Sequence, residues 1–119
     1  MNKPVRVIFL DEAKGEYEKV NELVGQQIKE GKESTFEMQL LRSIKQKIEF
    51  IKANPFYGNN IPKRYIPREY NVPNLWRVEL VNFWRMLYTI RGDQIEIICF
   101  ILEIIDHGRY DKIFGYRKK

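Results

Sequence analysis

Two arginines, Arg77 and Arg85, lie inside segments that otherwise have the composition of buried strands, LWRVEL and FWRMLYTI. Side chains alternate between the two faces of a strand, which places Arg77 on the same face as Glu79. If the two strands are neighbours and both arginines leave the same face, their guanidinium groups can converge on one phosphate. This hypothesis fails if either guanidinium is buried against a carboxylate, or if the two lie on opposite faces.

The same arginines also fit a structural explanation. Arg77 can pair with Glu79, and Arg85 can pair with an acid such as Glu96 or Glu103, as in ordinary cross-strand ion pairs. The sequence leaves both explanations open.

Basic and aromatic side chains interleave between residues 54 and 74, a mixture used where nucleic-acid bases stack and phosphates are neutralised. Proline and glycine recur there too often for a regular element, so we expect an ordered loop. Aromatic residues can also pin such a loop onto a sheet, and we favour that role for most of them. The basic residues are Lys63, Arg64 and Arg68, and the aromatic ones are Phe56, Tyr57, Tyr65 and Tyr70.

The first 54 residues are expected to form a strand and two helices. The apolar run Val5–Leu10 predicts a strand, and Asp11 predicts a cap for a helix that starts at about Glu12 and stops at Gly31. Ser34 and Glu37 have the spacing of a capping box for a second helix, which Asn54-Pro55 should end. Apolar stripes at helical spacing support both helices. They consist of Ala13, Tyr17, Val20, Val24 and Ile28, and of Phe36, Leu40, Ile44, Ile48 and Ile51.

The segment from Leu75 to Ile105 is rich in Val, Ile, Phe, Trp and Tyr and predicts an antiparallel meander, with a tight hairpin at Gly92-Asp93. The helical stripes need an apolar face to cover, and the meander supplies it. The predicted fold class is therefore α+β. It comprises an N-terminal strand, a two-helix hairpin and then a three-stranded antiparallel meander, with the helices packed on one face of the sheet.

The chain has 119 residues, of which 44% are hydrophobic, enough for one modest core. We expect a single domain over residues 1–119. The longest apolar run, Ile97–Leu102, is too short to span a membrane, so we expect a cytoplasmic protein. The only cysteine, Cys99, lies among apolar residues and is expected to be a buried packing residue.

Positive charge is concentrated in the second half of the chain. The net charge is +5, and residues 61–119 carry 11 Lys and Arg against 7 Asp and Glu. A bias of this kind suits a polyanionic partner, either a nucleic acid or an acidic protein. Charge alone does not choose between them.

The order strand, two helices and meander, together with LWRVEL, FWRMLYTI and a closing DHGRYDKIF, resembles the RelE/ParE superfamily of bacterial and archaeal toxins. The resemblance covers most of the chain and is best from Asn74 to Phe114. It implies a toxin that is held inactive by a cognate antitoxin, with a heterotetramer as one possible assembly. RelE-like members are ribosome-dependent endoribonucleases that cut mRNA, whereas ParE-like members inhibit DNA gyrase.

The resemblance also implies roles for individual residues. Arg85 matches the family's best-supported basic residue, which contacts the scissile phosphate, and Arg77 matches a position that is Lys in some active members. His107 and Tyr110 fall in the segment where active members place a His or basic residue and a Tyr. Two positions depart from the pattern. Glu79 stands where a second basic residue is expected, and Phe114 stands where a terminal Tyr is often found.

The implied reaction is attack of a ribose 2′-hydroxyl on the adjacent phosphate, which requires a proton acceptor, cations beside the phosphate and a proton donor, and no metal or cofactor. Arg77 and Arg85 suit the cationic role, His107 could transfer a proton, and Tyr110 could orient RNA or stack on a base. Contacts with RNA backbone are expected from basic residues of the loop and the C-terminal segment. These are Lys63, Arg64, Arg68, Arg109, Lys112, Arg117 and Lys118.

Two functions therefore remain after the sequence analysis. The first is a translation-inhibiting endoribonuclease that acts on mRNA at the ribosome. The second is a non-catalytic binder, either a gyrase inhibitor or an inactive member that only engages its antitoxin. Glu79 and Phe114 count against the catalytic function, since each replaces a residue type that active members use.

Overall fold

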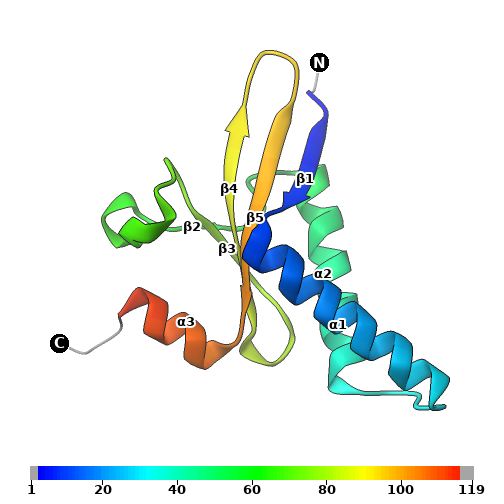
Figure 1. Ribbon diagram of the computed structural model, residues 1–119. Coiled ribbons are helices and arrows are strands. Elements are labelled where there is room, and N and C mark those ends of the chain that lie inside the picture. Colours follow the sequence, from blue (N-terminus) through cyan, green and yellow to red (C-terminus); the bar gives the residue numbers. More distant parts are fainter. Residues whose placement is uncertain (1–2, 116–119) are drawn as a thin grey trace.

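The computed structural model describes residues 3–115 and consists of a twisted five-stranded sheet with helices on both faces (Figure 1). The strand order is β1-β5-β4-β3-β2. The predicted meander is confirmed as β3 (Trp76–Glu79), β4 (Arg85–Gly92) and β5 (Ile97–Ile105). The N-terminal strand β1 (Val5–Phe9) pairs in parallel with β5, and the short strand β2 (Asn59–Asn60) pairs antiparallel with β3.

The two predicted helices are α1 (Asp11–Lys29) and α2 (Phe36–Ala53), and they pack on one face of the sheet (Figure 1). Their apolar stripes bury against the strands, which is the main source of stability for amphipathic helices of this length. The core on this face contains Ala13, Val20, Val24, Leu40, Leu41, Ile44 and Ile51 from the helices, with Val78, Met86, Tyr88, Cys99 and Ile101 from the sheet. Cys99 is fully buried, as expected, and burial raises the pKa of its thiol to about 11.

The helix caps differ from the predicted ones. Asp11 is the first residue of α1 and not its cap, because Leu10 holds the extended cap position. The cap of α2 is Thr35 and not Ser34, and its Oγ1 accepts a hydrogen bond from the Met38 amide at 3.1 Å. No capping box forms, because the Glu37 carboxylate accepts from Gln27 Nε2 of α1 at 3.0 Å.

The segment between α2 and β3 is ordered but contains more structure than the predicted loop. Besides β2, it has two 3-10 turns at Lys63–Tyr65 and Arg68–Tyr70. Gly58 allows the chain to pass close to the sheet, because a Cβ there would lie 2.9 Å from the Arg77 carbonyl oxygen and from the Tyr88 hydroxyl. The hairpin between β4 and β5 is also longer than predicted, with residues 93–96 between the strands.

The C-terminal segment forms a third helix, α3 (His107–Phe114), which the periodicity did not predict. It packs on the opposite face of the sheet from α1 and α2 (Figure 1). A smaller apolar cluster holds it there, formed by Ile61, Leu75, Leu87, Ile105 and Tyr110. The sheet therefore has one face devoted to the main core and a second face on which α3 covers only part of the strands.

Candidate active site

Arg77 and Arg85 leave the same face of neighbouring antiparallel strands, as the phosphate hypothesis requires. In the register of β3 and β4, Arg77 lies opposite Leu87 and Glu79 lies opposite Arg85. Both guanidinium groups reach the face covered by α3, where Tyr110 contacts each of them. The first condition of the phosphate hypothesis, a shared face, is met.

Glu79 stands between the two arginines. Its Oε2 lies 3.3 Å from Arg77 Nε and its Oε1 lies 3.4 Å from Arg85 Nε. The predicted pair of Arg77 with Glu79 is confirmed, but the predicted partners of Arg85 are wrong, because Glu96 pairs with Arg6 and Glu103 accepts from Tyr70. The second condition of the phosphate hypothesis, that neither guanidinium is buried against a carboxylate, is therefore met only in part. The Arg85 side chain is 13% exposed and lies against a carboxylate, but that carboxylate is itself 53% exposed.

Helix α3 brings the remaining candidate residues to this cluster. The Asp106 side chain caps its first turn by accepting from the Arg109 amide at 2.8 Å, and Gly115 ends it in the left-handed region at φ 62°. Tyr110 is 3% exposed, and its hydroxyl accepts a hydrogen bond from Arg77 Nη1 at 3.0 Å. The Arg85 guanidinium carbon lies 4.4 Å from the centre of the same ring, in cation–π geometry.

His107 is held through both ring nitrogens. Its Nδ1 lies 3.1 Å from Arg85 Nη1, and its Nε2 lies 3.3 Å from the Asp111 carboxylate. Because an arginine can only donate, Nδ1 must accept, and the proton of the neutral ring lies on Nε2. Asp111 was missed by the sequence analysis, although its position four residues after His107 on a helix was a usable signal.

The turn before β4 fixes Arg85 from its backbone side. It is a 3-10 turn at Val81–Phe83, in which Asn82 and Phe83 have φ values of 52° and 65°. Two successive non-glycine residues in this region are uncommon and cost free energy. The conformation directs the Phe83 carbonyl oxygen to Arg85 Nη1, at 2.7 Å. The Phe83 side chain is 70% exposed, and its ring centre lies 6.0 Å from that of His107.

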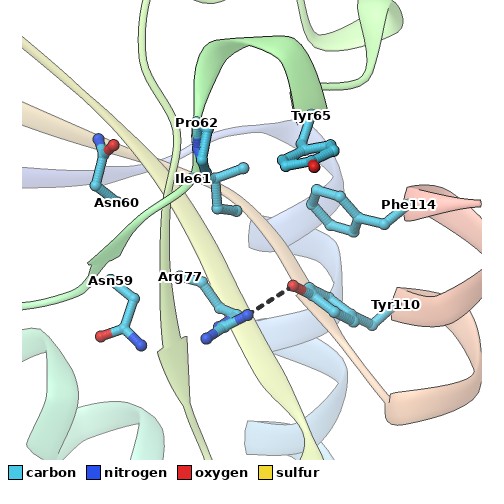
Figure 2. A pocket seen from close by; sticks show the side chains of 8 residues that line it. All are labelled: Asn59, Asn60, Ile61, Pro62, Tyr65, Arg77, Tyr110 and Phe114. Atoms are coloured by element: carbon cyan, nitrogen blue, oxygen red, sulfur yellow. Dashed lines mark hydrogen bonds between the residues drawn. The ribbon is translucent and has the colours of Figure 1, made fainter. Parts of the chain in front are cut away.

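The four residues predicted to be catalytic, Arg77, Arg85, His107 and Tyr110, therefore form one connected cluster that joins β3, β4 and α3. We refer to them together with Glu79 as the arginine cluster. A pocket of about 200 Å³ opens beside it, with Arg77 and Tyr110 in its wall (Figure 2). Phe114 also lines the pocket, so a ring is present there without the hydroxyl of a tyrosine.

The predicted RNA-binding residues are more scattered. Lys63 and Arg64 are exposed in the 3-10 turn whose Tyr65 lines the pocket, and Arg68 is exposed in the following turn. Lys112 is exposed on α3, whereas Arg109 faces a different hollow, which it lines with Glu16 and Trp84. Arg117 and Lys118 lie outside the described residues.

The aromatic residues of the loop act mainly as anchors, as we favoured. Phe56 packs edge-on against Trp76, and Tyr57 packs against Phe50. The Tyr70 hydroxyl donates to Glu103 Oε2 at 3.1 Å, and Glu103 is 8% exposed. Burial raises the pKa of the Glu103 carboxyl and of the Tyr70 phenol. Tyr65 differs in that Arg64, its neighbour in the same turn, lies over its ring, with the guanidinium carbon 4.7 Å from the ring centre.

Residues 3–115 lack two kinds of feature. No group of three or more His, Cys, Asp and Glu side chains there could hold a metal ion. No helix in that range combines the length and the apolarity required to cross a membrane.

No protein-family model matches the chain, and no curated protein is similar to it in sequence. Solved structures are similar to it in fold. One is a YoeB/ParE toxin from Agrobacterium tumefaciens, which superimposes with a TM-score of 0.58 at 12% sequence identity. The match covers 86% of this chain and 98% of that one. The predicted fold is thus confirmed: the chain has the α+β fold of a YoeB/ParE toxin.

Proposed function

We propose that the chain is the toxin of a toxin–antitoxin pair and that it cleaves mRNA on the ribosome in the cytoplasm. The fold supports the first part, because a toxin shares it over most of both chains. The arginine cluster supports the second part. The main observation in its favour is that Arg85 contacts both Tyr110 and His107, while Arg77 contacts the hydroxyl of the same Tyr110. Residues from three elements converge on one place that can receive a phosphate.

In the proposed reaction the ribose 2′-hydroxyl loses its proton and its oxygen forms a bond to the adjacent phosphorus. The bond from phosphorus to the 5′ oxygen breaks, and that oxygen takes up a proton. The products are a 2′,3′-cyclic phosphate and a 5′-hydroxyl. Arg77 and Arg85 stabilise the extra negative charge of the pentacoordinate state, and a guanidinium can do so through two parallel hydrogen bonds.

Two residues must change their contacts before RNA can occupy the site. The Glu79 carboxylate lies where a phosphate would meet both arginines, and its half-exposed side chain is free to turn outward. His107 has both ring nitrogens engaged, so it must exchange Asp111 for the RNA and also move its Nδ1 away from Arg85 Nη1. The second change is needed because the imidazolium that donates a proton from Nε2 carries N–H on both nitrogens. The His107 and Asp111 side chains are 56% and 41% exposed, so this exchange requires no unfolding.

The same contacts favour a second function. Glu79 stands where the resemblance implies a basic residue, and it neutralises part of the positive charge of Arg77 and Arg85. A chain with Glu at this position can engage an antitoxin or DNA gyrase without cutting RNA. Inhibition of DNA supercoiling by the purified protein, without any RNA cleavage, would select this alternative.

The experiment that tests the proposal is cell-free translation with the purified protein, followed by primer extension to map new 5′ ends. The proposal predicts cuts within codons of translated mRNA and none in free mRNA. Arg85→Ala should abolish the cuts, and Arg91→Ala is the matched control because Arg91 is exposed at the far end of the same strand. Intact mRNA after incubation with the wild type would refute the proposal.

A further inference from the structure

We infer that the pocket beside Arg77 binds a nucleobase, namely that of the nucleotide whose phosphate lies at the arginine cluster. This inference rests on the proposed function and adds to it the part of the substrate that the pocket holds. Figure 2 shows the residues that line it. They are Asn59, Asn60, Ile61, Pro62, Tyr65, Arg77, Tyr110 and Phe114.

Two aromatic rings, those of Tyr65 and Phe114, supply flat walls. Tyr110 is 3% exposed, with Arg85 over its ring and Phe114 packed against it. Tyr65 comes from the 3-10 turn after β2, whereas Tyr110 and Phe114 come from successive turns of α3, with ring centres 4.5 Å apart. Figure 2 shows Tyr65 and Phe114 next to each other at one end of the pocket. Every base has a π face that can stack on rings of this kind, so such walls accept a planar heterocycle.

Polar groups at the other end suit the edge of a base. Asn59 and Asn60 are exposed, and a side-chain amide both donates and accepts hydrogen bonds, as the edges of all four bases require. Ile61, 8% exposed, closes the floor between the rings and the amides. A pocket with aromatic sides and amides at one end fits a base better than a sugar or a lipid chain, because those ligands lack either the flat face or the polar edge.

The position of the pocket links the base to the phosphate. Arg77 belongs to both sites, because its Nη1 meets Tyr110 in the pocket wall while its Nε lies beside Glu79 in the arginine cluster. A nucleotide whose base enters the pocket therefore brings its phosphate to the arginines. Lys63 and Arg64 precede Tyr65 in the same turn and are exposed, so the rim that faces solvent is also positive.

The test measures binding without cleavage. The four nucleoside 5′-monophosphates and ribose 5-phosphate, which has no base, are titrated into ¹⁵N-labelled protein and followed by NMR. The inference predicts that the nucleotides bind roughly 10-fold more tightly than ribose 5-phosphate. The resonances that shift should include those of Asn59, Asn60 and Phe114.

Variants separate the base from the phosphate. Tyr65→Ala should bring nucleotides and ribose 5-phosphate to equal affinity, and the exposure of Tyr65 makes a folding defect small. Tyr57→Ala is the control, because Tyr57 is a comparably exposed ring that packs against Phe50 outside the pocket. Phe114→Leu keeps apolar volume, removes the π face and should also reduce the preference for nucleotides.

Equal binding of nucleotides and ribose 5-phosphate by the wild type would overturn the inference, and so would identical behaviour of Tyr65→Ala and Tyr57→Ala. Failure of the proposed function has a different signature. In that case nucleotides still bind through the pocket while ribosome-bound mRNA remains intact.

Discussion

The two faces of the sheet have different compositions, and the difference separates stability from chemistry. Among residues 3–115, the face under α1 and α2 buries a cluster of 14 apolar side chains. The face under α3 buries a cluster of only five, and beside it lie two arginines, Glu79, and the buried Glu103 with its Tyr70 partner. Because the first face supplies most of the apolar burial, the second can hold charged groups that a small domain would otherwise not tolerate.

The comparison predicts that the largest losses of stability come from the face under α1 and α2. Ile44 is fully buried there, and Ile44→Ala should lower the free energy of unfolding by about 3 kcal/mol in urea denaturation. Ile61→Ala, in the smaller cluster, should cost less, about 1–2 kcal/mol. Ile28→Ala is the surface control, since Ile28 is 62% exposed. Equal losses of unfolding free energy at Ile44 and Ile61 would show that both faces of the sheet contribute equally to stability.

A smaller effect is expected at the start of α2. Thr35 both caps the helix and donates from Oγ1 to Gln27 Oε1 of α1 at 2.6 Å. Thr35→Ala should therefore lower the free energy of unfolding by about 1 kcal/mol, whereas Ser34→Ala should change it by less than about 0.5 kcal/mol. The same urea titration measures both. A larger loss of stability in Ser34→Ala than in Thr35→Ala would indicate that Ser34 is the cap, as the sequence alone predicts.

On the face under α3, the account predicts that substitution of Glu79 changes anion binding more than stability. Glu79→Gln removes the charge that competes for both arginines and should tighten binding of inorganic phosphate about five-fold, which corresponds to about 1 kcal/mol. Isothermal titration calorimetry measures the affinity. Glu96→Gln is the matched control, because it breaks the pair with Arg6 away from the cluster. Unchanged or weaker binding in Glu79→Gln would mean that Glu79 does not occupy the phosphate site.

The smallest effect concerns pH. Burial raises the pKa of Glu103 above its ordinary value of 4.5, so the folded protein holds this proton to a higher pH than the unfolded chain does. The contribution of Glu103 to stability is therefore present below pH 4.5 and is lost as the pH rises through the folded pKa. Glu103→Gln keeps an acceptor for Tyr70 and should gain stability relative to the wild type as the pH increases from 4 to 8. A difference between the two proteins that stays constant with pH would contradict this.

The alternation within β3 was predictable because a strand has a fixed period of two, and it placed Arg77 on the same face as Glu79. That Arg77 and Arg85 share a face was only a condition of the phosphate hypothesis, because it depends on the register between β3 and β4. The partner of Arg85 was not predictable in the same way. It depends on the register between the two strands. That register is set by the turn that connects them, in which Asn82 and Phe83 take left-handed conformations. Asn favours this conformation but Phe does not, so the two residues together do not reveal the turn, and Glu79 was found as the partner of Arg77 alone.

Helix α3 escaped prediction for a different reason. It has eight residues, too few for an apolar stripe to repeat, and its inward residues Tyr110 and Phe114 resemble strand residues in composition. Its cap, Asp106, was visible in the sequence, but it became meaningful only once the preceding strand was known to end at Ile105. The contact of His107 with Arg85 could not be predicted because it needs both the helix and the turn at Phe83, whereas the contact with Asp111 needs only the helix.

The measurement that tests the central claim most directly is the rate of mRNA cleavage on programmed ribosomes by Arg85→Lys relative to the wild type. Lysine keeps the positive charge but cannot contact Tyr110, His107 and the Phe83 carbonyl together as the guanidinium does. The account predicts a rate lowered by about 100-fold or more, with stability changed little. A rate within about three-fold of the wild type would show that the arginine cluster does not form the phosphate site.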